Sequence, residues 1–336
     1  MALFHGINVD EQLKIKGKKS CGVSIAVAQG DDVTTYCAGS GRFAQDFPVH
    51  PEMLFQAGSV SKPMFALTLL RYKDKGIIDL DGDISGVLSD IVDFPLTFPA
   101  LLSHTAGFNV HGFNGYRARH RLLTLEDVIL GRGNSPKVKQ TMSYGEQYCY
   151  SGGGITLAEL AFTRMTGTTL RDAFEKEVSA PLGLTKSGFF QPLDEDKIPN
   201  AAFGGMLGIF EDRKHGYHYY PEQAAAGFWT TPTELVKIGV AISRSVREGG
   251  FLRKETAERM VTPVKDRVGL CIFRGTDMPE LAGHDGWNCG FLTTWKFSLT
   301  EDLCVAAMIN KSTVSVNKRL CDMGKTLFVN ARDEML

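Results

Sequence analysis

The chain has 336 residues, and its 37 lysines and arginines against 38 aspartates and glutamates give a formal net charge of −1. This length allows one large domain or two intertwined ones, with a core that needs neither metal nor disulfides. The near-neutral charge argues against a protein that binds nucleic acid or an anionic membrane, because such binding draws on an excess of Lys and Arg.

No stretch approaches the roughly 18 consecutive apolar residues of a membrane span. The amino-terminal residues lack the cationic-then-apolar order of a signal peptide, so we expect a cytoplasmic protein that does not act at a membrane. The seven cysteines never form Cys-x-x-Cys, and neither a zinc site nor a disulfide framework is expected. A phosphate-binding loop and a dinucleotide fingerprint are also missing, so we expect no metal and no cofactor.

In chain order, the pattern first predicts a strand hairpin over residues 22–29 and 33–38. A helix is expected over about 60–75, and it must begin near Ser59 because Pro63 is tolerated only in a first helical turn. Further elements are expected later in the chain, namely helices over 156–166, 231–247 and 316–331, and strands over 268–274, 291–298 and 303–310.

Strands at both ends with helices between them predict an α/β (α+β) fold, in which both termini build one antiparallel sheet flanked by helices. The predicted sheet domain is discontinuous, over residues 1–75 and 231–336. A mostly helical domain over residues 76–230 is inserted into it. We expect the active site to lie between the two domains.

The first motif that could carry chemistry is Ser-Val-Ser-Lys at residues 59–62. Ser59 and Lys62 are three residues apart, which places both on one helix face about one turn apart. A serine hydroxyl is a weak nucleophile until a nearby base takes its proton, and a lysine one turn on can be that base. The start of a helix also offers free backbone N–H groups to an anion. Ser-x-x-Lys also occurs often by chance, and taken alone these residues more commonly form a helix cap beside a solvated lysine.

The second motif is Tyr-Ser-Gly-Gly-Gly at residues 150–154. A tyrosine just before a glycine cluster fits a constrained loop from which Tyr150 projects into a cleft. A lysine ammonium nearby would favour the phenolate and make Tyr150 a usable base. The alternative is that Tyr150 packs in the core and the glycines form a turn before the helix.

The third motif is Gly-His-Asp-Gly-Trp at residues 283–287, which leads into the strand at 291–298. A glycine at position 286 removes a side chain that would block a substrate lying along a strand edge. The N–H of Trp287 could be the second donor of an oxyanion hole. The alternative is a hairpin turn with a surface histidine.

In this order and at these separations, the three motifs resemble those of the serine β-lactamase and penicillin-recognising superfamily, in particular the group of class C β-lactamases, D,D-peptidases and family VIII esterases. The resemblance implies a β-lactamase/transpeptidase-like fold. It extends over about residues 50–310 through stretches similar to that group, at 75–81, 101–107, 181–184 and 225–232.

The resemblance implies roles for individual residues. Ser59 would be the acyl-accepting nucleophile, and Lys62 would help deprotonate it and hold Tyr150 in its reactive state. Tyr150 would pass the proton to the leaving group, and the backbone N–H groups of Ser59 and Trp287 would form the oxyanion hole. His104 and Thr105 match a structural motif and receive no chemical role.

Two departures from the family pattern concern substrate binding. The second motif has Gly152 where an asparagine is usual, so the amide that binds a substrate's side-chain amide is missing. The third motif has His284, Asp285 and Gly286 where Lys-Thr-Gly is usual, and a histidine replaces a permanent cation with a weaker, pH-dependent one. Both departures weaken the interpretation as a specialised β-lactamase or D,D-carboxypeptidase.

We therefore predict a serine hydrolase that acts through an acyl-enzyme on small-molecule substrates, with a β-lactamase-related carboxylesterase as the leading interpretation. β-Lactamase, D,D-carboxypeptidase, D-aminopeptidase and acyltransferase activities on an ester, amide or β-lactam remain alternatives that use the same site. A non-catalytic penicillin-binding module is a further alternative. A Ser-His-Asp hydrolase is disfavoured because no Gly-x-Ser-x-Gly is present and Asp285 adjoins His284 in sequence, where it is poorly placed to orient it.

Overall fold

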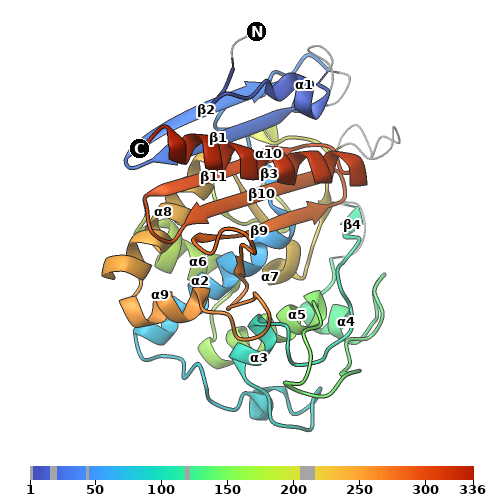
Figure 1. The fold of residues 1–336 in the computed structure, drawn as a ribbon. Coiled ribbons are helices and arrows are strands. Elements are labelled where there is room, and N and C mark those ends of the chain that lie inside the picture. Colours follow the sequence, from blue (N-terminus) through green and yellow to red (C-terminus); the bar gives the residue numbers. More distant parts are fainter. Residues whose placement is uncertain (1–2, 16–20, 43–44, 118–121, 205–215) are drawn as a thin grey trace.

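The computed structural model describes residues 3–15, 21–42, 45–117, 122–204 and 216–336. Its main sheet has six antiparallel strands in the order β2-β1-β11-β10-β9-β8 (Figure 1). Val23 near the amino terminus pairs with Ile309 near the carboxyl terminus, which confirms the sheet predicted from both termini. The strands of this sheet are β1 (Val23–Gln29), β2 (Asp32–Ala38), β8 (Phe273–Arg274), β9 (Leu281–Asn288), β10 (Phe291–Ser298) and β11 (Leu303–Ile309).

Helices cover both faces of this sheet. Ile25 and Val27 of β1 join an apolar cluster with α10 (Val314–Asp333), which crosses in front of the sheet in Figure 1, and with α1 (Val9–Leu13). Ala26 and Ala28 point to the opposite face, which packs on α8 (Pro232–Glu248). Because both of their faces are buried, the central strands β1 and β11 are nearly continuous apolar runs, whereas the edge strand β2 is largely exposed and polar.

The remaining helices gather on the β9 side of the sheet in Figure 1. They are α2 (Ser61–Asp74), α3 (Phe98–Leu102), α4 (Leu125–Ile129), α5 (Gly152–Thr166), α6 (Leu170–Phe174), α7 (Gln223–Ala226) and α9 (Lys254–Val261). Short strands connect them, namely β3 (Phe55–Gln56), β4 (Tyr116–Arg117), β5 (Gly188–Phe189), β6 (His218–Tyr219) and β7 (Phe228–Thr230).

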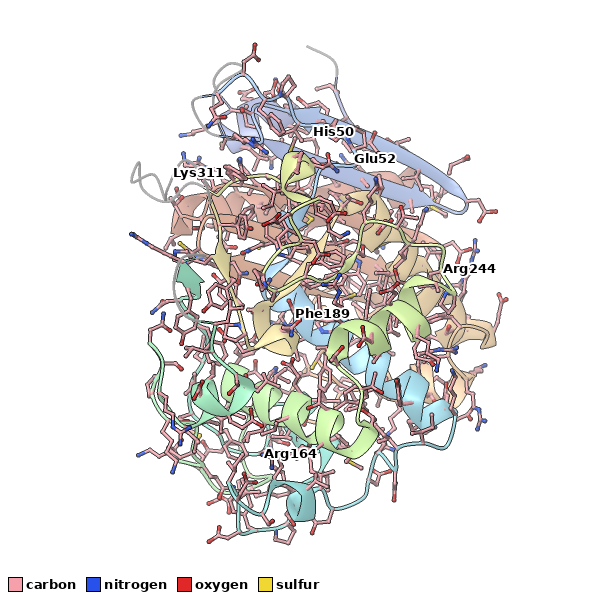
Figure 2. All side chains as sticks on the ribbon, turned by 180° about the vertical axis from the view of Figure 1, so that it is seen from behind. His50, Glu52, Arg164, Phe189, Arg244 and Lys311 are labelled. Carbon is pink, nitrogen blue, oxygen red and sulfur yellow. The ribbon has the colours of Figure 1, made fainter. Side chains whose placement is uncertain are left out.

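One apolar cluster continues from the α8 face of the sheet into these helices. Phe189, which Figure 2 labels in the interior, packs against Phe174 and Phe228 with ring centroids 5.4 and 5.1 Å away. The division into domains at residues 75 and 230 stays a prediction. No helix in the described ranges combines the length and apolarity needed to cross a membrane.

Most predicted elements are found within two residues of their expected bounds, but two predictions were wrong. The helix expected from residue 156 begins at Gly152, because Ser151 caps it by accepting a 2.8 Å hydrogen bond from the N–H of Gly154. The glycines therefore form a helical turn and not a loop. The strand expected over 268–274 is reduced to Phe273–Arg274, and the residues before it make only isolated bridges.

Candidate active site

Ser59 lies in a single 3₁₀ turn, Gly58–Val60, between β3 and α2. Gly58 has a φ of 53°, a left-handed conformation that glycine adopts without strain. This turn brings Ser59 to the wall of a cavity of about 1110 Å³, where its side chain is partly exposed. The cavity is also lined by aromatic and apolar side chains, among them Phe113, Tyr148, Tyr150, Phe273, Met278 and Trp287.

Lys62 lies in the first turn of α2 and is only 2% exposed. Its Nζ donates to the Ser59 Oγ at 3.1 Å and to the Ala225 carbonyl oxygen at 2.7 Å. Burial lowers the pKa of Lys62 to about 7, because an ammonium loses its hydration there. Near neutral pH a large fraction of Lys62 is therefore a neutral amine, whose lone pair can take the Ser59 proton.

Tyr150 is packed among aromatic rings, with its ring centroid 4.4 Å from that of His104 and 4.7 Å from that of His111. The Lys62 Nζ lies 5.1 Å from the centre of the Tyr150 ring. Burial raises the pKa of Tyr150 above its ordinary value, and a hydrogen bond with Ser59 only partly offsets this. The expectation that Lys62 favours a Tyr150 phenolate was wrong, because burial disfavours the charged forms of both residues. Tyr150 meets Ser59 as a neutral phenol.

Two neighbouring serines have their hydroxyl groups committed elsewhere. The Ser61 Oγ donates to the Gly58 carbonyl oxygen at 2.6 Å and accepts from the Phe228 N–H at 2.9 Å. The Ser151 Oγ donates to the Asn109 carbonyl oxygen at 2.6 Å, in addition to capping α5. Both hydroxyls are thus engaged by backbone groups, which leaves Ser59 as the candidate nucleophile at this wall.

Strand β9 runs directly against the Ser59 turn. A Cβ added at Gly286 would lie 1.9 Å from the Ala57 carbonyl oxygen and 3.3 Å from the Ser59 nitrogen, and one added at Gly58 would lie 2.6 Å from the Trp287 nitrogen. The two N–H groups predicted to form the oxyanion hole therefore belong to backbones in close contact. The reason expected for glycine at 286 was wrong, because its missing side chain makes room for this backbone contact and not for substrate.

Asn288, two residues after Gly286 on β9, links this strand to the rest of the site by hydrogen bonds. Its Nδ2 donates at 2.9 Å both to the Gln56 Oε1 on β3 and to the Ala226 carbonyl oxygen at the end of α7. The Asn288 side-chain amide thus joins β9 to two segments of the site. One is β3, which precedes Ser59, and the other is α7, where the Ala225 carbonyl oxygen accepts from Lys62.

His284 is not the weak cation that the sequence predicts. It is 4% exposed, and its Nδ1 donates to the Asp285 carbonyl oxygen at 2.6 Å. Burial, followed by the nearby Lys62 charge, lowers the pKa of His284 to about 3, so the ring is neutral near pH 7. Its Nε2 has no hydrogen-bond partner among the described residues.

The Asp285 side chain points to other partners. Its Oδ1 accepts from the Thr294 hydroxyl and from the Lys296 Nζ on β10, each at 2.7 Å. The carboxylate therefore does not orient His284, in agreement with the argument against a Ser-His-Asp triad. Lys296 also lines the cavity and was missed from the sequence. A lysine in the predicted strand that directly follows the third motif was the signal that could have found it.

Gly152 is placed differently from the other predicted substrate-binding residues. His284, Asp285 and Gly286 line the cavity, whereas Gly152 does not line it. A Cβ added at Gly152 would lie 2.9 Å from the Phe113 ring, so this position is filled by packing. The absence of an asparagine there reflects a different local packing, and the prediction of a substrate contact at Gly152 is not supported.

Comparison with known proteins assigns the chain to a family. The sequence model of the Beta-lactamase family matches residues 11–323. The chain belongs to the Beta-lactamase family. Within this family, it is 29% identical over 249 residues to the acyltransferase calJ of Penicillium decumbens, covering 64% of this chain and 58% of that protein. It is 25% identical over 211 residues to a lovastatin esterase of Penicillium rubens, covering 54% and 51% of the two chains.

The fold of this Beta-lactamase family member is similar to that of a D-amino acid amidase from Ochrobactrum anthropi SV3. The TM-score is 0.78 at 18% sequence identity, and the match covers 97% of each chain. This likeness shows the β-lactamase/transpeptidase-like fold. The chain spans about half of the length of the curated relatives it matches.

Proposed function

We propose that this Beta-lactamase family member is a serine hydrolase that forms an acyl-enzyme on Ser59 and acts as a carboxylesterase. The observation that carries the proposal is the 3.1 Å contact between the Ser59 Oγ and the buried Nζ of Lys62, whose pKa is lowered to about 7. A lysine in this state is a base matched to neutral pH, which a structural lysine does not need to be.

In the proposed mechanism, Lys62 takes the hydroxyl proton of Ser59 as the Oγ attacks the substrate carbonyl carbon. The developing oxyanion is bound by the N–H groups of Ser59 and Trp287. Tyr150, a phenol beside Ser59, gives its proton to the departing alkoxide and recovers one from the Lys62 ammonium. Water then releases the acid from Ser59 by the reverse use of the same groups.

The preference for esters rests on the charge around the reacting serine. His284 is neutral near pH 7, so the position of the usual family lysine provides no cation for a substrate carboxylate. Lys296, which lines the cavity, is engaged by Asp285 at 2.7 Å. Arg267, Arg274 and Lys325 line the cavity as well, but none of them occupies the position of the family lysine. Neutral esters need no such cation, and apolar side chains such as Phe113 and Phe273 offer contacts to their acyl or alkyl parts.

A hydrolysis panel tests the proposal. Short and long p-nitrophenyl esters should be hydrolysed by the wild type and not by Ser59→Ala, whereas nitrocefin and a D-Ala-D-Ala peptide should be poor substrates. Hydrolysis of nitrocefin or the peptide in preference to every ester would replace the esterase assignment with the β-lactamase or peptidase alternative. No covalent adduct and no turnover with any member would favour the non-catalytic binding module.

Acyl transfer is the second candidate, because a cavity of about 1110 Å³ has room for an acyl group and an acceptor alcohol together. An added alcohol that diverts product from acid to ester, in proportion to its concentration, would identify this activity. Product that stays entirely acid at every alcohol concentration would exclude it.

A further inference from the structure

Glu222 is a fully buried carboxyl group next to the candidate base, and it does not line the cavity. It directly precedes α7, and its carbonyl oxygen accepts from the N–H groups of Ala225 and Ala226, each at 3.1 Å. The Ala225 carbonyl oxygen in turn accepts from the Lys62 Nζ at 2.7 Å. The same short helix therefore carries Glu222 and holds the amine of Lys62 in place.

The side chain of Glu222 has no evident structural task. Neither of its carboxylate oxygens has a hydrogen-bond partner in another described residue, although the side chain is 0% exposed, and only its own backbone N–H interacts with it. Burying a polar group in this way is costly, and such groups are frequent at functional sites. Glu159 on α5, the other buried carboxyl group here, differs because its Oε2 accepts a 2.8 Å hydrogen bond from the N–H of Ala224.

Several titratable groups lie close enough to Glu222 or Lys62 to interact with them electrostatically. Glu222 is close enough for charge interaction with Lys62, Glu159, Tyr116 and Tyr219. Lys62 itself is surrounded by Ser59, Tyr150, Cys271, His104, His111 and His284. Among these described neighbours, Glu222 is the carboxyl group whose charge acts on Lys62.

We propose that Glu222 is a positioning residue that sets the protonation state of Lys62 through the charge of its buried carboxyl group; this inference rests on the proposed acyl-enzyme mechanism. When the Ser59 O–H bond breaks and an N–H bond forms on Lys62, an ammonium appears in a site without bulk water. Burial raises the pKa of Glu222 to about 8, while its own backbone N–H and the Lys62 charge lower it, so Glu222 and Lys62 titrate in the same pH range. The ionised fraction of Glu222, which grows as the pH rises toward 8, stabilises that ammonium until its proton leaves through Tyr150.

The variant that tests this is Glu222→Gln, with Glu159→Gln as the matched control. Both replace a buried carboxyl group with an amide of the same shape, and the Glu159→Gln amide oxygen can still accept from Ala224. Because the carboxylate stabilises the ammonium, removing it should shift the titration midpoint of Lys62 to lower pH by about one unit. The acidic limb of the kcat/KM profile for a p-nitrophenyl ester should move by the same amount.

The titration can be followed without activity, by NMR of ¹³Cε-labelled lysines, with the Lys62 resonance assigned from its loss in Lys62→Met. An unchanged Lys62 midpoint in Glu222→Gln, or an equal shift in Glu159→Gln, would overturn the inference. If Glu222→Gln does not fold, the wild type still decides. The ¹³Cδ resonance of Glu222 must show an inflection where Lys62 titrates, and its absence would also overturn the inference. If the Lys62 midpoint shifts in Glu222→Gln but the wild type hydrolyses no ester, the proposed function would be wrong and the inference about Glu222 would stand.

Discussion

Gly286 on β9 lies so close to Ala57, at the entrance to the Ser59 turn, that a Cβ added to it would be 1.9 Å from the Ala57 carbonyl oxygen. Real Cβ atoms do not approach an oxygen so closely. The absence of one methyl group therefore allows the backbone of β9 to touch the turn that carries the nucleophile. The two N–H groups of the predicted oxyanion hole depend on this contact.

Gly286→Ala should therefore damage catalysis by moving β9 away from Ser59. We expect kcat to fall by about 10²–10³, the loss found when one oxyanion donor is removed. The added methyl should also destabilise the chain by about 1–3 kcal/mol. Steady-state kinetics and chemical denaturation measure both effects, and exposed Gly86→Ala, where no heavy atom lies within 4 Å of an added Cβ, is the control. A Gly286→Ala variant with wild-type kcat would show that the oxyanion hole does not depend on the contact between β9 and the Ser59 turn.

Lys62→Met removes the proposed base, and kcat should fall by about 10²–10⁴. Folding lowers the pKa of Lys62 from 10.5 to about 7, so the unfolded chain binds more protons between these pH values. The cost of burying Lys62 is thus complete below pH 7 and lost above pH 10.5, and is on the order of 5 kcal/mol before compensation by its hydrogen bonds.

The inactive Lys62→Met variant should therefore be more stable than the wild type at pH 7, and this gain should shrink toward pH 10. Urea denaturation at the two pH values measures the difference. Exposed Lys237→Met on α8 is the control and should change neither activity nor stability appreciably. A gain that grows with pH would contradict the lowered pKa of Lys62.

Tyr150→Phe should affect esters according to their leaving groups. The variant lacks the phenol that is proposed to protonate the departing alkoxide, which matters most for a strongly basic one. We expect an alkyl ester to lose about 10²–10⁴ in kcat/KM and the matching p-nitrophenyl ester to lose much less. Equal losses for the two esters would show that Tyr150 does not protonate the leaving group.

Burial of His284 should make the folding stability of the protein fall at acidic pH. Folding lowers its pKa from 6.5 to about 3, so between these values the unfolded chain gains a proton that the folded chain cannot bind. Stability should therefore fall as the pH drops from 6.5 toward 3, by up to about 5 kcal/mol from this residue. In His284→Asn, the slope of the unfolding free energy against pH should be smaller over this interval.

The control for this measurement is His50→Asn. His50 is exposed and lies near the β1–β2 hairpin, as labelled in Figure 2. This variant controls for the replacement of a histidine by asparagine at an exposed position. A slope that stays unchanged in His284→Asn would mean that the buried imidazole takes up a proton in the folded state.

The sequence predicts those parts of the site that depend on local geometry. Ser59 and Lys62 are one helical turn apart, and Pro63 confines the start of the helix, so their contact requires little beyond α2 itself. The hairpin of β1 and β2 and the amphipathic helices α8 and α10 are local patterns as well. The sheet shared by both termini was predicted because strands lie at both ends of the chain with helices between them.

The parts that the sequence does not predict depend on burial and on distant contacts. His284 has the pattern of a surface turn, yet packing around Tyr150 removes its charge. Lys296 lies only nine residues after Trp287, but the β9–β10 register is what brings it beside Asp285 at the cavity. Glu222 lies in a segment with no catalytic pattern, and only the fold brings it to Lys62.

The central claim is that Ser59 is the acyl-accepting nucleophile, and one measurement tests it most directly. The protein is treated with a fluorophosphonate and digested, and the modified residue is identified by mass spectrometry. We expect a single adduct on Ser59, with no adduct in Ser59→Ala, whose circular dichroism spectrum and Tm should show a folded chain. An adduct on Ser61 or Ser151, or ester turnover that survives in folded Ser59→Ala, would contradict the account.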